Sequence, residues 1–382
     1  MSLSDEGRGY SGSPTAPLLK VRDLWVRFRL RDRQVWAVNG LSYELLDGQT
    51  LAIVGESGSG KTVGARALMG LLPETASVTG SARFDDEELL GLSDKEMRRH
   101  RGADLAMVFQ DPARSLNPTM RVGAQITEAI RAHSATGAAG AAGAAGAAGA
   151  AGAAGAAGAA GAAGAAGAAG TAGTAAAAGR RAAQERAVEL LRLVRLPAPE
   201  QRFAEYPHQL SGGMRQRVVI AIALASRPRL LIADEATTAL DVTTQAQIMD
   251  LLLELQGRLG MGLIMISHDL GLAASYADEI VVMYAGRAVE RAPTRQLFAH
   301  VRMPYTKVLL EAVPRIERPP HSPLPVVHGR PPDLTTLAVG CPFAPRCPSA
   351  RDTCQEASPP FEEHEPAHWW ACWYPCEDGE PQ

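Results

Sequence analysis

The chain has 382 residues, with 38 Lys or Arg against 41 Asp or Glu and a net charge of −3. This length exceeds one common domain, so we expect one large domain with a smaller appendage. The balanced charge and the lack of a long basic run argue against a nucleic-acid surface, so no nucleic-acid partner is expected. No strongly apolar run of about eighteen residues occurs, which argues against a membrane-spanning helix.

The chain begins with a polar tail followed by two strand-like segments. Residues 1–16 are rich in Ser, Gly and charge and contain no apolar run. We therefore expect a disordered tail and not a signal peptide. Apolar and polar residues then alternate over 18–28 and 34–44. Alternation is typical of strands with one buried face, so it predicts an antiparallel β-subdomain.

A glycine-rich loop follows the apolar run 51–54 and reads Gly-Glu-Ser-Gly-Ser-Gly-Lys-Thr over residues 55–62. A strand, this loop and a helix, in that order, form the setting in which the pattern binds phosphate. Glycines let backbone N–H groups point at an anion, Lys61 adds a positive charge, and Thr62 offers a hydroxyl to Mg²⁺. The candidate nucleotide-binding residues are Gly55, Ser57, Gly58, Ser59, Gly60, Lys61 and Thr62.

Gly recurs at every third position between residues 137 and 173, and Ala fills nearly all the rest. The lack of proline argues against a collagen-like triple helix, and Ala and Gly bring too little hydrophobic driving force for a membrane helix. We interpret the stretch 137–179 as a flexible low-complexity insertion. A periodic apolar face predicts a helix over 180–193, which Pro197 and Pro199 end.

Polar residues follow several of the later apolar segments. Residues 210–217 read Leu-Ser-Gly-Gly-Met-Arg-Gln-Arg, the strand 230–233 ends at Asp234 and Glu235, and His268 comes just after the strand 262–266. With 49–54 and 106–109, these strands are expected to form a largely parallel α/β core with helices on both faces. Residues 281–290 read as a hairpin that closes the core.

These motifs resemble, in order, those of the ABC ATPases. The resembling segments are the Walker A loop 55–62, the Q-loop 108–112, the signature 210–217, the Walker B strand 230–235, the D-loop 239–241 and the switch-histidine segment 266–269. The resemblance implies a P-loop NTPase fold with a mostly parallel core sheet, an antiparallel β-subdomain and a helical subdomain. It also implies ATP as the nucleotide and Mg²⁺ as its metal. The expected domains are an ATPase domain over 17–292, its helical subdomain over about 111–212 containing the Gly/Ala insertion, and an extension over 293–382.

The resemblance assigns roles that agree with phosphoryl-transfer chemistry, which depends on positioning and charge neutralisation. Glu235 would act as the general base on the attacking water, His268 would contact the γ-phosphate, and Gln110 would sense metal and water. Thr62, Gln110 and Asp234 would hold Mg²⁺. Further nucleotide contacts are assigned to Ser211, Gly212, Gly213 and Asp241. In the family the signature acts on the nucleotide of the facing subunit, so the working unit is expected to be a dimer.

An aromatic side chain on the first hairpin stacks on adenine in this family. Phe28 stands about where that residue should be, and Trp36 is a rival. Either side chain could instead pack in the core.

All five cysteines lie between Cys341 and Cys376. The segments 303–306, 329–332 and 340–348 resemble the C-terminal extension of oligopeptide and dipeptide importer ATPases. The resemblance favours a 4Fe–4S cluster on Cys341, Cys347, Cys354 and Cys372, with Cys376 as a spare. Thiolates also suit zinc, and unmetallated thiols stay open as a third reading. A helix near 294–300, another near 305–313 and a proline-rich link over 314–332 should precede the cysteines.

The predicted function is that of the ATP-hydrolysing subunit of a peptide importer. The expected partners are two membrane permease subunits, a second ATPase subunit that is a paralogue, and, indirectly, an extracytoplasmic peptide-binding protein. Residues 111–120 and 203–208 are candidates for the permease contact, or simply pack within the subdomain. The expected location is the cytoplasmic face of the cell membrane, as a peripheral protein. The alternatives are an importer of nickel or another small solute, and a soluble ABC ATPase of translation or DNA repair.

Overall fold

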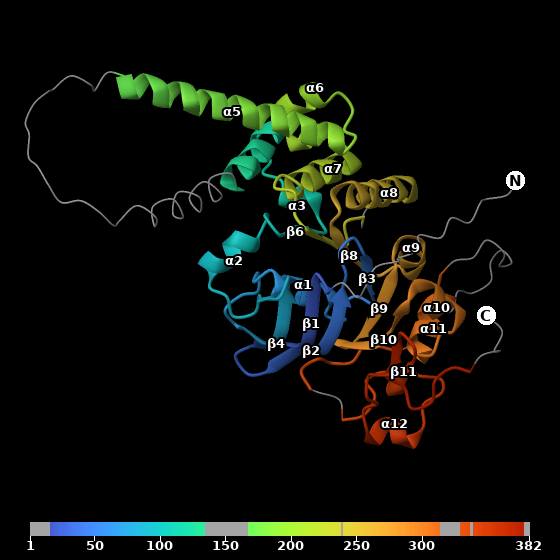
Figure 1. Cartoon of the computed structure of the whole chain (residues 1–382). Helices are drawn as coiled ribbons and strands as arrows, with labels where there is room; N and C mark the ends of the chain where they lie inside the picture. The colour runs from blue at the N-terminus through green and yellow to red at the C-terminus, as the bar shows by residue number, and fades with distance from the viewer. Residues whose placement is uncertain (1–15, 134–166, 238–239, 314–328, 337–338, 378–382) are drawn as a thin grey trace, which may run out of the picture. The chain divides into compact units, whose positions relative to one another are not determined.

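The structure is a computed structural model that describes residues 16–133, 167–237, 240–313, 329–336 and 339–377. The chain divides into two compact units (Figure 1). Unit 1 comprises Met1–Leu51, Gly55–Gly91 and Ala277–Gln382, and unit 2 comprises Ala52–Val54 and Leu92–Tyr276. Residues 1–15 of the tail predicted over 1–16, and most of the Gly/Ala insertion, lie outside the described residues.

Unit 1 contains the predicted antiparallel β-subdomain. Its strands run in the order β2 (Gln34–Leu45), β1 (Leu19–Arg29), β4 (Ala76–Phe84) and β5 (Glu87–Glu88). Strand β1 pairs antiparallel with both β2 and β4. The inward side chains of β1, among them Leu19, Val21 and Leu24, are almost fully buried, which is the one-sided burial that the alternation predicted.

A second group of strands in unit 1 joins the middle of the chain to its C-terminal part. The predicted hairpin is present as β9 (Glu279–Tyr284) and β10 (Arg287–Pro293). Strand β12 (His368–Trp370) pairs with β10, and β11 (Glu362–Glu365) pairs with β12. The helices of this unit are α1 (Lys61–Leu68), α10 (Thr294–Ala299), α11 (Pro304–Glu311), the short turn η2 (Ala344–Arg346) and α12 (Asp352–Glu356). The C-terminal extension is therefore continuous with the sheet of this unit.

Unit 2 contains the parallel strands. β6 (Leu105–Val108) pairs parallel with β7 (Leu230–Asp234), which pairs parallel with β8 (Gly262–Ser267). Strand β3 (Thr50–Val54), of which Ala52–Val54 belong to this unit, lies beside β8. Every residue of these four strands is buried, which explains why they read as continuous apolar runs.

Helices make up the rest of unit 2. They are α2 (Asp94–His100), α3 (Pro112–Ser115), a helix over 122–133, α5 (Gly167–Leu193), α6 (Pro199–Ala204), η1 (Pro207–Gln209), α7 (Gly212–Ala223), α8 (Val242–Leu259) and α9 (Leu270–Tyr276). None of the helices in the described ranges combines the length and the apolarity that a membrane crossing needs.

Helix α5 corrects one sequence prediction (Figure 1). The helix was expected to begin near residue 180, after a flexible Gly/Ala insertion, but it begins at Gly167. Ala187, Leu190 and Leu191 are fully buried and anchor its C-terminal half. Extending an anchored helix adds one hydrogen bond per residue, and Ala, the strongest helix former, offsets the cost of about 1 kcal/mol for each Gly.

Candidate nucleotide site

The phosphate loop lies between β3 and α1, and the side chain of its lysine, Lys61, is buried. Lys61 is only 5% exposed. Its ammonium donates to the carbonyl oxygens of Gly55 at 2.7 Å and Glu56 at 2.9 Å, and to Ser59 Oγ at 3.4 Å. Thr62 follows it in the first turn of α1. The loop thus presents a fixed positive charge at a helix N-terminus, a setting suited to an anion.

Two glycines of the loop are required by their surroundings. A Cβ at Gly60 (φ +98°) would lie 2.2 Å from the carbonyl oxygen of Ala37. A Cβ at Gly55 would lie 2.2 Å from the carbonyl oxygen of Met283. Backbone atoms cannot move aside as side chains do, so the loop is seated against β2 and β9 only because both positions lack a side chain.

Two carboxylates, one predicted to bind Mg²⁺ and one predicted to act as the base, stand at the end of β7. Asp234, its last residue, is 2% exposed. Glu235 follows in the left-handed region (φ +46°), and its backbone N–H donates to the Ile266 carbonyl at 3.0 Å. A non-glycine residue held in this region is uncommon, and such conformations concentrate at functional sites.

Two predicted partners lie around the Glu235 carboxylate. Gln110 Nε2 donates to Glu235 Oε2 at 2.6 Å across 125 residues of sequence. His268 Nδ1 lies 3.8 Å from Glu235 Oε1. Unit 2 therefore brings the three residues predicted to be catalytic to one point, whereas their individual roles stay predictions.

The signature segment is exposed at the start of α7. Ser211 caps this helix, and its Oγ accepts the backbone N–H of Met214 at 3.3 Å. Ser211 and Gly212 are exposed, and Gly213 is half-buried. A Cβ at Gly213 would lie 2.6 Å from Thr244 Cγ2, so this position is packed against the start of α8.

Asp241, predicted to contact nucleotide from the D-loop, caps α8. Its carboxylate accepts the backbone N–H of Thr244 at 2.9 Å and the Thr244 hydroxyl at 2.7 Å. These two hydrogen bonds hold the pKa of Asp241 below its usual range. The first D-loop residue, Ala239, lies outside the described residues.

The two aromatic candidates differ in their packing. Phe28 is half-buried on β1, opposite Val35 of β2. Trp36 packs edge to face on Trp25, with ring centroids 6.2 Å apart, and lies under the Arg27 guanidinium. Since Trp36 is engaged inside the β-subdomain, Phe28 stays the better candidate for adenine stacking.

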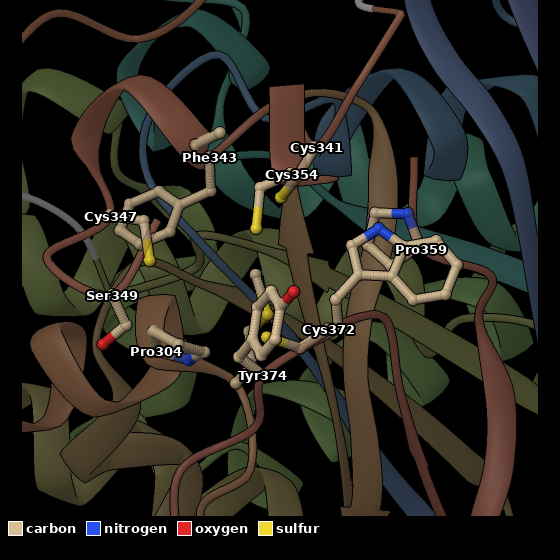
Figure 2. Close-up of a pocket in the computed structure, with 12 residues that line it drawn as sticks. Pro304, Cys341, Phe343, Cys347, Ser349, Cys354, Pro359, Cys372 and Tyr374 are labelled. Atoms are coloured by element: carbon tan, nitrogen blue, oxygen red, sulfur yellow. The ribbon is translucent and has the colours of Figure 1, made fainter. Parts of the chain in front are cut away.

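Four of the five cysteines line one cavity in unit 1 (Figure 2). They are Cys341, Cys347, Cys354 and Cys372. Burial raises the pKa of Cys341 and Cys347, and raises that of Cys372 to about 12. Within the described residues, however, no three His, Cys, Asp or Glu side chains are arranged to hold a metal ion. The structure gathers the predicted residues without forming a metal-ligand geometry.

Residues from a distant part of the chain bind the phosphate loop at Glu56, and the sequence did not indicate them. Glu56 was left unassigned as a variable position of the motif, yet its carboxylate binds Arg346. Tyr305 accepts the backbone N–H of Glu56 at 2.9 Å. These partners lie some 250 to 290 residues away in sequence, and no local pattern signals such a pairing.

The chain matches two family models. Residues 38–238 match the ABC transporter model, and residues 289–354 match the model of the oligopeptide/dipeptide transporter C-terminal region. The first match covers more than half of the chain. The chain belongs to the ABC transporter family. The prediction of this family and of its fold class is confirmed.

This ABC cassette is similar to proteins named oligopeptide transport ATP-binding protein. It is 43% identical to the oligopeptide transport ATP-binding protein OppD of Salmonella typhimurium, over 99% of each chain. It is 46% identical to the protein of that name from Mycobacterium tuberculosis over 94% of this chain, but this covers only 52% of the relative. The chain thus spans about half the length of the mycobacterial relatives.

Solved structures agree on the fold of the ABC cassette. A dimeric ATP-binding cassette in a post-hydrolysis state, bound to ADP and Pi, is similar with a TM-score of 0.55 and 23% identity, over 72% of this chain and 99% of that one. The cbiO1 protein of Clostridium perfringens, part of an ABC transporter complex, has a TM-score of 0.54 and 25% identity, over 74% of this chain and 91% of that one.

Proposed function

We propose that this ABC cassette binds and hydrolyses ATP to energise the import of di- or oligopeptides across the cytoplasmic membrane. The observation that carries the proposal is the grouping of Gln110 and His268 around Glu235. The match of residues 289–354 to the oligopeptide/dipeptide transporter C-terminal region supports a peptide cargo. The named function of the full-length Salmonella relative supports it too.

Hydrolysis in this proposal needs a bound phosphate and a water molecule activated by a general base. Lys61, already fixed in the loop, neutralises charge on the outer phosphates, and the backbone N–H groups of the loop bind the rest. Glu235 accepts a proton from the attacking water, while Gln110 orients that carboxylate through its amide. His268, exposed beside Glu235, contacts the γ-phosphate.

Mg²⁺ would be held by Thr62, Gln110 and Asp234, whose side chains each carry an oxygen of the kind that it takes. Asp234 offers a buried carboxylate at a strand end, and Thr62 and Gln110 offer further oxygens. When bound, Mg²⁺ neutralises negative charge on the phosphate oxygens.

Two cassettes form the working unit in this proposal. Ser211 and Gly213 stand at the exposed N-terminus of α7, where they can reach a phosphate on another molecule. Thr244, near the start of α8, packs on Gly213. Asp241 is exposed and caps α8 through Thr244, so it belongs to the same surface as Gly213. The facing cassette is a paralogue, and the pair docks on two permease subunits at the cytoplasmic face of the membrane. An extracytoplasmic peptide-binding protein delivers the cargo.

The cysteine cavity would hold a 4Fe–4S cluster. Four thiols line this one cavity, and thiolates are the ligands that such clusters take. The thiols would have to draw closer, because as they stand the described side chains do not form a ligand set. A bound cluster would crosslink a segment with few regular elements. Anaerobic purification followed by iron, sulfide and zinc analysis tests this, and a colourless protein with one equivalent of zinc would exclude the cluster.

A membrane pull-down tests the transport function. Detergent-solubilised membranes are passed over the tagged full chain carrying Glu235→Gln, which is expected to bind ATP and to stay closed on its partner. Permeases and a second cassette should co-purify, and the wild-type complex should hydrolyse ATP faster when peptide is present. Recovery of ribosomes or DNA instead would establish the soluble alternative, and stimulation by nickel but not by peptide would change the cargo.

A further inference from the structure

Glu56, the residue after the first glycine of the phosphate loop, is bound by the C-terminal extension. Arg346 Nη1 donates to Glu56 Oε2 at 2.7 Å, and Nη2 donates to Oε1 at 3.0 Å. Two parallel hydrogen bonds of this kind fix the carboxylate in orientation as well as in charge. Arg346 belongs to the turn η2, between Cys341 and Cys347, so the contact joins two segments that are 290 residues apart.

The ion pair is shielded from solvent. The Arg346 side chain is 5% exposed and the Glu56 side chain 22%. Arg346 Nη1 also donates to the Tyr284 hydroxyl at 3.1 Å. Tyr284, Tyr305 and Phe343 form an aromatic cluster beside the pair, with centroid separations of 4.6 to 5.3 Å. An ion pair in such surroundings is screened much less than one at the surface.

The same contacts reach the backbone of the loop. The Glu56 N–H donates to the Tyr305 hydroxyl oxygen at 2.9 Å, and the Glu56 carbonyl accepts the Lys61 ammonium at 2.9 Å. Glu56 is therefore held at its side chain, its N–H and its carbonyl. A shift of this residue would also move the carbonyl that orients Lys61.

Because Glu56 is negatively charged, the ion pair affects the binding of a phosphate as well as the stability of the fold. Glu56 is the one acidic residue of the loop 55–62, and a carboxylate beside a phosphate site repels the ligand. Arg346 supplies the opposite charge at hydrogen-bonding distance. Without it, the loop would carry an uncompensated negative charge next to the position of the nucleotide phosphates.

We propose that Arg346 is a positioning residue for nucleotide binding: it neutralises and orients Glu56, so that the affinity of the phosphate loop depends on the C-terminal extension. The proposal rests on the proposed ATP-binding function and adds a residue to it. A purely structural ion pair would hold the extension in place without changing the affinity of the folded protein for nucleotide.

The test compares four variants of the full chain by titration with ATP and Mg²⁺. Arg346→Gln should weaken ATP binding about tenfold, the size expected for a coupled charged pair. Its KM for ATP should rise by a similar factor while kcat at saturating ATP changes less than about twofold. Glu56→Gln in the same chain should recover most of the lost affinity, because the repelling charge is gone. Arg346→Lys, which keeps the charge but loses the paired hydrogen bonds, should be intermediate.

The control is Arg351→Gln. Arg351 is an exposed arginine of the same extension, and its guanidinium stacks on Tyr374 instead of binding the phosphate loop. It should bind ATP as the wild type does. Thermal unfolding of each variant measures folding separately. If Arg346→Gln binds ATP within twofold of the wild type, or if Glu56→Gln fails to recover affinity in a double variant that is folded, the proposal is wrong. Failure of the wild-type chain to bind ATP would instead overturn the proposed function.

Discussion

Lys61 in the phosphate loop lies among carbonyl and hydroxyl oxygens of its own loop, whereas Ser211 in the signature segment is exposed to solvent. The loop is also fixed from outside, by backbone close to Gly55 and Gly60 and by the side chains that hold Glu56. The Ser211 hydroxyl accepts a hydrogen bond from the backbone N–H of Met214, within its own helix turn.

The difference indicates how each segment meets a nucleotide. A loop that is already ordered loses little conformational entropy on binding, so it can bind the nucleotide of its own chain tightly. An exposed helix N-terminus with a lightly held serine is suited to a phosphate that another molecule brings. Changes in the loop should therefore affect folding and binding, and changes in the signature should affect turnover.

The largest effect is expected for Gly60→Ala. The new Cβ would meet the Ala37 carbonyl at 2.2 Å with φ at +98°, so the unfolding free energy should fall by more than about 2 kcal/mol and ATP binding should be lost. Thermal unfolding and ATP titration measure both. Gly58→Ala is the matched control: φ is also positive, at +81°, but nothing lies within 4 Å of its Cβ, so a smaller loss is expected. Equal losses in the two variants would contradict the steric explanation.

A change in catalysis without a change in binding is expected for Glu235→Gln. Removing a general base lowers turnover by about 10²- to 10⁴-fold, while Lys61 and the loop still hold the nucleotide. Steady-state hydrolysis and ATP titration of the same sample separate the two effects. Turnover equal to that of the wild type would remove Glu235 from the base role.

Ser211→Ala should act mainly on turnover by the assembled complex. Loss of the cap costs about 1 kcal/mol of stability at the start of α7. ATP affinity of the isolated chain should not change, whereas hydrolysis by the two-cassette complex should fall. Ser226→Ala is a control in the same unit for loss of a serine hydroxyl away from the signature. Weaker ATP binding by the isolated Ser211→Ala chain would contradict the claim that the signature, unlike the phosphate loop, does not bind the nucleotide of its own chain.

The smallest effect is expected at Asp241. Its pKa is lowered in the folded state by the hydrogen bonds from Thr244. The carboxylate therefore contributes stability above its ordinary pKa of about 3.9, and this contribution is lost as pH falls through the lower, folded value. Asp241→Ala should show a smaller loss of thermal stability than the wild type between pH 5 and pH 3, each being about a unit from the ordinary pKa. If the variant and the wild type lost the same thermal stability across that range, protonation of Asp241 would not affect the stability of the fold.

The sequence by itself determined the strands and the motifs of this chain. Period-two alternation marked β1 and β2, continuous apolar runs marked β3, β6, β7 and β8, and the positions of Lys61, Asp234 and Ser211 followed from the order of the motifs. These signals are local, because alternation, glycine runs and caps report the backbone geometry and burial of neighbouring residues.

Only the tertiary structure decided which distant side chains meet. The bonds from Gln110 to Glu235 and from Arg346 to Glu56 join residues 125 and 290 positions apart. The sequence also did not predict that α5 begins as early as Gly167. The start of this helix depends on its buried C-terminal half more than on the helix propensity of the residues near Gly167. Such contacts depend on chain topology and on the packing that excludes water around them, and neither leaves a periodic trace in the sequence.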